Sequence, residues 1–223
     1  MNFREKETHI IKGTHKRPTF LVAIPTFGMV HISFHIAAQR LQMPTNAAIE
    51  SIVTIKKEIG EAREYIINYY LSKSDDIRPD YLFFLGDDML PPWDALINLH
   101  HIMTTENWDV LSGLYYIKQD PPKPILWRDG IVGHLQEGVH YKLDETVISD
   151  IAGMDFTLIK PDILKKINPP YFRTGPTLTD TGGVWTHTED AWFCKKVKEA
   201  GGRIGVATSI RIGHININTG EIY

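Results

Sequence analysis

The chain has almost no cysteine and no long apolar run, and each absence excludes a class of protein. The only cysteine among its 223 residues is Cys194, so no disulfide can form within the chain. The longest apolar runs, such as residues 20–24 and 81–85, are far shorter than the roughly 18 residues that a membrane helix needs. No apolar stretch near residue 1 resembles a signal peptide. The sequence therefore predicts a cytoplasmic protein without a membrane span.

An excess of either charge sign is also lacking. Lys and Arg total 24 against 27 for Asp and Glu, which gives a net charge of −3 without long charged runs. The overall electrostatic field therefore does not favour nucleic acid as a partner. With 43% hydrophobic residues and no internal repeat, the chain is expected to form one compact domain. We place this domain at residues 18–223, after a polar N-terminal segment at residues 1–17.

Apolar runs alternate with helical periodicities along the chain. In the first half we expect strands at residues 20–24, 47–55 and 81–85 and helices at residues 30–42 and 59–71. Such alternation predicts an α/β domain with a mostly parallel sheet flanked by helices. Later we expect strands at 109–114, 156–159, 204–206 and 210–212, and helices at 91–102, 161–167 and 189–200. Residues 115–141, rich in proline, glycine and aromatics, are expected to form strands and loops over the sheet.

Two acidic residues, Asp87 and Asp88, directly follow the apolar strand predicted at residues 81–85. Ligands of open α/β sheets bind beyond the carboxyl ends of the strands. Adjacent carboxylates repel each other, and a divalent cation that prefers oxygen ligands would neutralise them. A solvated turn with an acidic helix cap explains the same pattern, because Asp is common at helix starts.

A second motif opens the helix predicted at residues 189–200. Thr186 and Glu189 have the spacing of a capping box, and the helix dipole would favour Asp190 in the first turn. Asp190 could instead act as a general base that accepts the proton of an attacking hydroxyl group. On spacing alone, helix capping is the better interpretation.

A third motif is the pair Gly213 and His214, which follows the strand predicted at residues 210–212. A neutral imidazole is a common ligand for transition metals. The chain has ten histidines, so the position of His214 in the sequence does not by itself assign it to a metal site.

In this order, the three motifs and the first strand resemble those of GT-A glycosyltransferases, particularly the family 2-like group. The resemblance extends from about residue 18 to residue 214, over residues 22–26, 61–63, 85–92, 153–159, 188–190 and 213–214. It implies a GT-A, Rossmann-like fold and the transfer of a sugar from a nucleotide-sugar donor to a hydroxyl acceptor, with a UDP-sugar as the favoured donor. The acceptor could be a glycan, a small molecule, a protein or a modified base in phage-type DNA.

The resemblance also assigns the donor-binding side chains. It places Pro25 and Thr26 at the nucleotide base, Arg63 facing the nucleotide, and Asp87 near the ribose. In such enzymes the last acid of an Asp-x-Asp signature binds the metal, and this acid corresponds to Asp88. The implied cofactor is a divalent metal ion, Mn²⁺ or Mg²⁺.

For the remaining site residues, the resemblance implies that His214 completes the metal site and that the pair Glu189 and Asp190 supplies the catalytic base. We expect Asp190 to be this base in an inverting displacement. For the acceptor side we nominate Asp155, Trp185 and His187, because sugar recognition uses polar and aromatic groups near the base. Packing, loop bracing and surface exposure are the simpler roles for these three side chains.

Two positions depart from the family pattern. Gly86 stands where the signature has its first acid, and Glu64 stands where an asparagine usually follows the arginine. A sugar nucleotidyltransferase is one alternative, but it would need a glycine-rich loop where this chain has Pro25-Thr26-Phe27-Gly28. A non-catalytic nucleotide-sugar binding protein is another, which Gly86 mildly favours. A DNA acceptor would need a basic stripe, for which solvated surface lysines are the simpler interpretation. The residues that could contribute to it are Lys12, Lys16, Arg17, Lys118 and Lys123.

Overall fold

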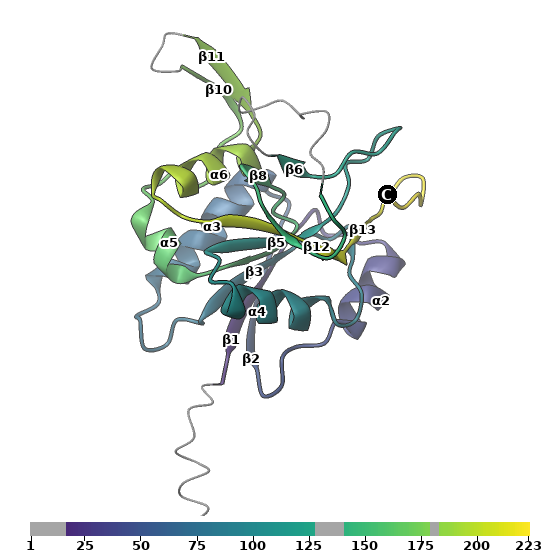
Figure 1. Cartoon of the computed structure of the whole chain (residues 1–223), viewed down its shortest axis with the longest axis horizontal. Helices are drawn as coiled ribbons and strands as arrows, with labels where there is room; N and C mark the ends of the chain where they lie inside the picture. Colours follow the sequence, from purple (N-terminus) through teal and green to yellow (C-terminus); the bar gives the residue numbers. More distant parts are fainter. Residues whose placement is uncertain (1–16, 128–140, 179–182) are drawn as a thin grey trace, which may run out of the picture.

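The computed structural model describes residues 17–127, 141–178 and 183–223 and is built on a seven-stranded sheet (Figure 1). The strand order is β2-β1-β3-β9-β5-β12-β7. The strands are β1 (Thr19–Thr26), β2 (Ala48–Ile55), β3 (Tyr81–Leu85), β5 (Val110–Leu114), β7 (Thr146–Ile148), β9 (Phe156–Ile159) and β12 (Ile204–Arg211). Strands β1, β2, β3, β5 and β12 run in one direction, and β7 and β9 run in the other. The predicted mostly parallel sheet is confirmed.

Helices cover both faces of this sheet. One face packs against α3 (Ile59–Ser72), α5 (Pro161–Lys166) and α6 (Glu189–Glu199), and the other against α2 (Ile32–Arg40) and α4 (Ala95–Thr105). Successive β3 residues alternate between the two cores, with Phe84 on the α3 side and Phe83 on the α4 side. A strand buried on both faces needs a continuous apolar run, which explains the sequence of β3. Residues 1–16 of the predicted N-terminal segment lie outside the described residues.

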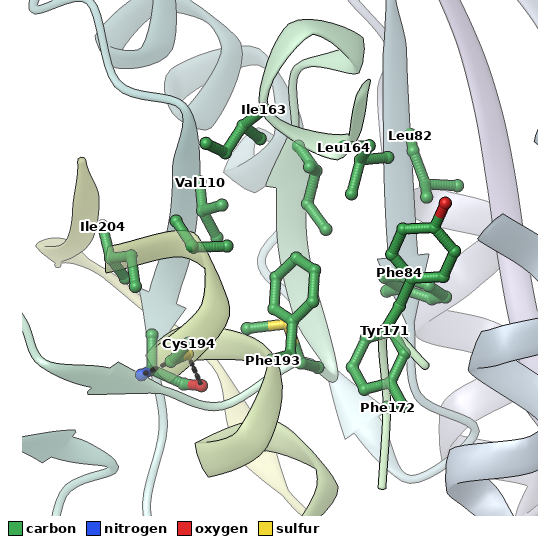
Figure 2. Close-up of a cluster of buried hydrophobic side chains, with 14 of the residues drawn as sticks. Leu82, Phe84, Val110, Ile163, Leu164, Tyr171, Phe172, Phe193, Cys194 and Ile204 are labelled. Atoms are coloured by element: carbon green, nitrogen blue, oxygen red, sulfur yellow. Dashed lines mark hydrogen bonds between the residues drawn. The ribbon is translucent and has the colours of Figure 1, made fainter. Parts of the chain in front are cut away.

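The core on the α6 side contains a group of aromatic rings among aliphatic side chains (Figure 2). Phe193 stacks on Phe172 with ring centroids 4.8 Å apart, and Phe172 meets the edge of Phe84 at 6.0 Å. Beside them, the buried Cys194 sulfur accepts a hydrogen bond from the Ala152 N–H at 3.5 Å. Burial raises the pKa of the Cys194 thiol to about 12. Cys194 is therefore a protonated packing residue, as its place on an apolar helix face predicts.

Some element boundaries differ from those predicted. Helix α4 begins at Ala95 and not at Pro91, because Pro91 and Pro92 follow the short strand β4 (Met89–Leu90) and lead into a turn. In this turn the Ala95 N–H donates to the Pro92 carbonyl at 3.1 Å. Residues 204–212 were expected as two strands, but β12 is continuous, with a register shift between Ala207 and Arg211. Such an irregularity allows a strand to bend without ending.

Three two-stranded ladders accompany this sheet in the described residues. They pair β4 (Met89–Leu90) with β13 (Gly213–His214), β6 (Leu126–Trp127) with β8 (Ile151–Ala152), and β10 (Gly175–Leu178) with β11 (Val184–His187). In Figure 1 the β10-β11 hairpin projects beyond α6, whereas β13 lies near the C-terminus. Of the predicted strands and loops at 115–141, residues 128–140 lie outside the described residues. In the described ranges, none of the helices has the length and apolar character needed to cross a membrane.

Replacing Phe193 with alanine is expected to lower the free energy of unfolding by about 3–5 kcal/mol, because its fully buried ring would leave a cavity. Urea unfolding measures this change. The matched control is Ile77→Ala, at a side chain that is 64% exposed, where the expected change is below about 0.5 kcal/mol. Equal, small effects in the two variants would contradict the place of Phe193 in the core.

Candidate functional site

The candidate site lies where strands β1 and β3 end and strand β9 begins. Leu85, the last residue of β3, pairs with Phe156, the first residue of β9, because the two strands are antiparallel. Asp155, the residue before β9, therefore lies beyond the same end of the sheet as Asp87 and Asp88, at the carboxyl end of β3. The Gly86 N–H donates a hydrogen bond to the Asp155 carbonyl at 2.7 Å, which holds the two segments together.

This contact explains the glycine in the acidic signature. A Cβ atom at Gly86 would lie 2.8 Å from the Cβ atom of Asp155 and 3.0 Å from its carboxyl carbon. No side chain fits at position 86 while Asp155 holds its place. The carboxylate next to this position therefore belongs to Asp155, directly before the neighbouring strand β9, and not to residue 86.

The predicted donor-side residues meet at the end of β1. Pro25 and Thr26 are its last two residues, and the Thr26 hydroxyl hydrogen-bonds both the Gly28 N–H, at 2.9 Å, and Asp87. Burial raises the pKa of Asp87, and the hydrogen bond from Thr26 partly opposes the rise. The structure thus brings Thr26 and Asp87 together at the edge where ligands of such sheets bind.

The two predicted metal ligands are also neighbours. Gly213 and His214 form the short β13 strand, which pairs with β4 directly after Asp88, and the Ile215 N–H donates to the Asp88 carbonyl at 2.9 Å. This pairing places the His214 Nε2 atom 3.3 Å from the Asp88 Oδ2 atom, although the residues lie 126 positions apart. A two-residue ladder therefore assembles the pair.

The tautomer of His214 follows from the hydrogen bond that its other ring nitrogen, Nδ1, makes. Its Nδ1 atom lies 2.7 Å from the Tyr116 carbonyl oxygen, and a carbonyl oxygen can only accept. Nδ1 therefore carries the proton, and in the neutral ring Nε2 presents its lone pair toward Asp88. Metal-binding histidines are oriented in the same way by a carbonyl or carboxylate behind the ring.

A third group, which the sequence did not place here, completes this cluster. The Lys118 ammonium donates a hydrogen bond to the same Asp88 Oδ2 atom. Burial would raise the pKa of Asp88, but the neighbouring His214 and the Lys118 ammonium lower it below its ordinary value. Asp88 is therefore ionised at neutral pH. The sequence names Lys118 only as a contributor to a basic stripe and does not indicate its contact with Asp88.

The donor set of Asp88 and His214 fits a divalent metal ion that shares its coordination with a substrate. The pair offers a carboxylate oxygen and an imidazole nitrogen, both of which suit Mn²⁺ and related ions. In the described part of the chain, no cluster of three or more His, Cys, Asp or Glu side chains is arranged to hold a metal. Two protein ligands leave coordination positions for phosphate oxygens and water, as is usual for Mg²⁺-type sites on phosphorylated substrates.

A buried arginine organises the acids on the α3 side. The Arg63 side chain is 2% exposed, and its Nη1 atom lies 2.8 Å from Glu189 and 2.5 Å from Asp190. Its Nη2 atom lies 2.5 Å from the Asp155 carboxylate. One guanidinium thus pairs with carboxylates from the first turn of α6 and from the residue before β9. Arg63 was expected to face the nucleotide, and its two Nη atoms face these acids.

The charge of this cluster does not balance, because one cation faces three carboxylates. Burial raises the pKa of Asp190 to about 8, and the charge of Arg63 only partly offsets this rise. Burial raises the pKa of Asp155 as well. Asp190 therefore keeps its proton over much of the neutral range. Carboxylates with raised pKa values are typical of groups that exchange protons with substrates.

The N-cap of α6 is Thr188 and not the predicted Thr186. The Thr188 hydroxyl accepts from the Ala191 N–H at 3.4 Å, and Thr186 lies on β11. The capping box predicted from Thr186 and Glu189 is wrong, since Glu189 is the first helical residue and reaches Arg63. Helix capping thus does not depend on the Glu189 side chain.

The second departure from the family pattern has a structural role. The carboxylate of Glu64 accepts hydrogen bonds from the backbone N–H groups of Tyr171, at 2.6 Å, and Phe172, at 2.9 Å. It therefore anchors the segment that packs beside α3. An asparagine at this position could not accept both bonds as a charged group does.

Two of the three nominated acceptor residues lie on the β10-β11 hairpin. His187 is 5% exposed, bonds the Thr177 hydroxyl through Nε2 at 2.8 Å, and stacks on Trp192 at 5.0 Å. These contacts are structural, and its acceptor role stays a prediction. Trp185 belongs to β11, and its side chain lies outside the described part of the structure. Asp155, the third, lies with Glu189 and Asp190 around Arg63.

Comparisons with known proteins identify the fold. No protein-family model matches the sequence, and no curated protein matches it. The structure of A197 from STIV is similar with a TM-score of 0.59 and 20% identity, over 90% of this chain and 86% of that one. The structure of GalNAc-T7 with UDP, GalNAc and Mn²⁺ is similar with a TM-score of 0.58 and 10% identity, over 91% of this chain and 44% of that one. The expected GT-A-like fold is confirmed.

Replacing Arg63 with glutamine is expected to lower the free energy of unfolding by about 3–5 kcal/mol at pH 8, because three carboxylates lose their buried cation. The loss should be smaller at pH 5, where protonated acids need no counter-charge. The wild-type protein has the same sign of pH dependence. The folded pKa of Asp190 lies above its ordinary value, so its contribution is present below about pH 4 and lost as the pH rises through about 8.

Urea unfolding at both pH values tests this prediction. The control is Lys57→Gln, which removes an exposed pair with Glu61 on the same helix and should cost less than about 1 kcal/mol at either pH. A loss in Arg63→Gln that does not change between pH 5 and pH 8 would show that the carboxylates do not set the stability of the cluster.

Proposed function

We propose that this chain is a metal-dependent glycosyltransferase that moves a sugar from a nucleotide-sugar donor, with a UDP-sugar favoured, to a hydroxyl acceptor. The observation that carries the proposal is the pairing of Asp88 with His214 at the sheet edge that also holds Asp190. The similar fold of GalNAc-T7, a structure that contains UDP, GalNAc and Mn²⁺, supports the type of donor and of ion.

The metal-binding side of the site consists of Asp88 and His214. The Asp88 carboxylate and the His214 Nε2 atom would hold Mn²⁺ or Mg²⁺, since both point to one place and Asp88 is ionised. When bound, such an ion stabilises the negative charge that develops on the leaving diphosphate. Thr26 and Asp87, joined by a hydrogen bond at the end of β1, would bind the nucleoside part of the donor.

On the acceptor side, Asp190 serves as the general base. Its carboxylate takes the proton of the acceptor hydroxyl while that oxygen attacks the anomeric carbon. The bond from this carbon to the diphosphate breaks, its electrons leave with the nucleoside diphosphate, and the sugar inverts. Arg63 and Glu189 position Asp190 in this step, because Nη1 of Arg63 holds both carboxylates. Asp155, which is held by Nη2 of the same guanidinium, would contact the acceptor beside them.

A thermal-shift screen of nucleotide-sugars in the presence of Mn²⁺ tests the proposed function. A cognate donor at 100 times its dissociation constant adds about 2.7 kcal/mol of stability. Release of free sugar or transfer to an added acceptor then separates an enzyme from a binding protein. If no nucleotide-sugar raises the melting temperature with Mn²⁺, the proposal fails.

Replacing Asp88 with asparagine should abolish Mn²⁺-dependent nucleotide binding while the fold is kept, because the neutral amide is a poor ligand for a divalent ion. Isothermal titration with UDP and Mn²⁺ measures the loss, and circular dichroism checks the fold. Asp144→Asn, at an exposed acid, is the matched control and should bind as the wild type does. Normal metal-dependent binding in Asp88→Asn would remove Asp88 from the metal site.

Replacing Asp190 with asparagine should reduce sugar transfer about 10²–10⁴-fold and leave the donor dissociation constant unchanged, because the base acts only in the transition state. In the wild type, the transfer rate should rise with pH up to about 8, as the raised pKa of Asp190 requires. Transfer rates measured from pH 6 to pH 9 test both statements. Near-normal transfer, together with a free energy of unfolding lowered by about 0.3–1 kcal/mol, would mean that Asp190 only serves the helix dipole.

A further inference from the structure

Lys118 lies where a cation is needed. Its ammonium hydrogen-bonds the Asp88 Oδ2 atom, which is also 3.3 Å from His214 Nε2. Because the Nδ1 proton of His214 points to the Tyr116 carbonyl, Nε2 of the neutral ring has only a lone pair to offer. A lone pair and a carboxylate oxygen repel each other at this distance unless a positive charge lies beside them. Lys118 supplies that charge.

The loop that carries Lys118 is fixed to the same cluster. Tyr116 binds His214 through its carbonyl, and Lys118, two residues later, binds Asp88. Backbone hydrogen bonds close the loop, from Ile117 N–H to the Lys123 carbonyl, from Gln119 N–H to the Ile117 carbonyl and from Ile125 N–H to the Tyr115 carbonyl, each at 2.9 Å. The side chains of Lys118 and Asp88 are only 26% and 23% exposed. Their pairing is therefore part of the site and differs from an exposed surface ion pair.

We propose that Lys118 holds the cation position while the divalent ion is absent, and that Lys118 and the ion compete for Asp88. This inference rests on the proposed metal-binding role of Asp88 and His214. Paired with Lys118, the partly buried Asp88 carboxylate is never left without a counter-charge, which would be costly. Lysine suits this role, because its compact charge sits on a flexible four-carbon stem and can leave without movement of the backbone.

Competition has a measurable consequence for ion binding. Each ion that binds must displace the Lys118 ammonium from Asp88, so the wild-type protein binds the ion more weakly than the two ligands alone would. Lys118→Met removes the charge and keeps most of the side-chain volume. It should tighten Mn²⁺ binding at least about tenfold, which corresponds to about 1.4 kcal/mol.

The experiment measures the Mn²⁺ dissociation constant of the full chain without nucleotide, from the electron paramagnetic resonance signal of free Mn²⁺. Lys118→Met and Lys118→Gln should both bind more tightly than the wild type, and Lys118→Arg, which keeps the charge, should not. Lys123→Met is the matched control from the same loop and should leave the dissociation constant unchanged. The gain should also disappear when Asp88→Asn is combined with Lys118→Met, because it acts through that carboxylate.

The outcomes separate this inference from the function on which it rests. Mn²⁺ binding that is equal or weaker in both Lys118→Met and Lys118→Gln overturns the competition, while Asp88 and His214 remain the metal ligands. Absence of Mn²⁺ binding in the wild type and in every Lys118 variant overturns the competition together with the metal site. Tighter binding in Lys118→Arg as well would show that loop contacts, and not the charge, limit the affinity.

Discussion

The site depends on the burial of one guanidinium. Arg63 lies on the buried face of α3, and a buried cation is tolerated only when carboxylates surround it. Glu189 and Asp190 reach it from the first turn of α6, and Asp155 reaches it from the residue before β9. The same ion pairs that neutralise Arg63 therefore fix the start of α6 and the start of β9 at one edge of the sheet.

Local patterns predicted most elements, because they report burial directly. The continuous apolar run of β3 and the helical periodicity of α3 match the structure closely. The direction of β9 could not be read in this way, since an apolar run is the same for a parallel and an antiparallel strand. That direction decides which end of β9 reaches the site, and it brings Asp155 beside Gly86.

For the site, the sequence motifs named residues but not their partners. Asp88 and His214 were linked by resemblance alone, and the β4-β13 ladder gives the physical reason for their contact. Lys118 carries no motif, and its bond to Asp88 depends on how the loop after β5 folds over the sheet edge. A motif also does not show which charges a fold places around Arg63, and its role at the nucleotide stays a prediction.

The predicted metal ligands, Asp88 and His214, and the acid cluster are held in fixed relation by Tyr115. Its ring meets His214 edge-on at 5.5 Å, and its hydroxyl accepts from the Asp155 N–H at 3.0 Å. A Cβ atom at Gly153 would lie 2.0 Å from this hydroxyl, so a glycine is required for the tyrosine to reach between the two groups. Displacement reactions need the leaving group and the base in a set geometry. In the proposed reaction, the fully buried and doubly anchored Tyr115 side chain would hold the predicted metal ligands and the acid cluster in such a geometry.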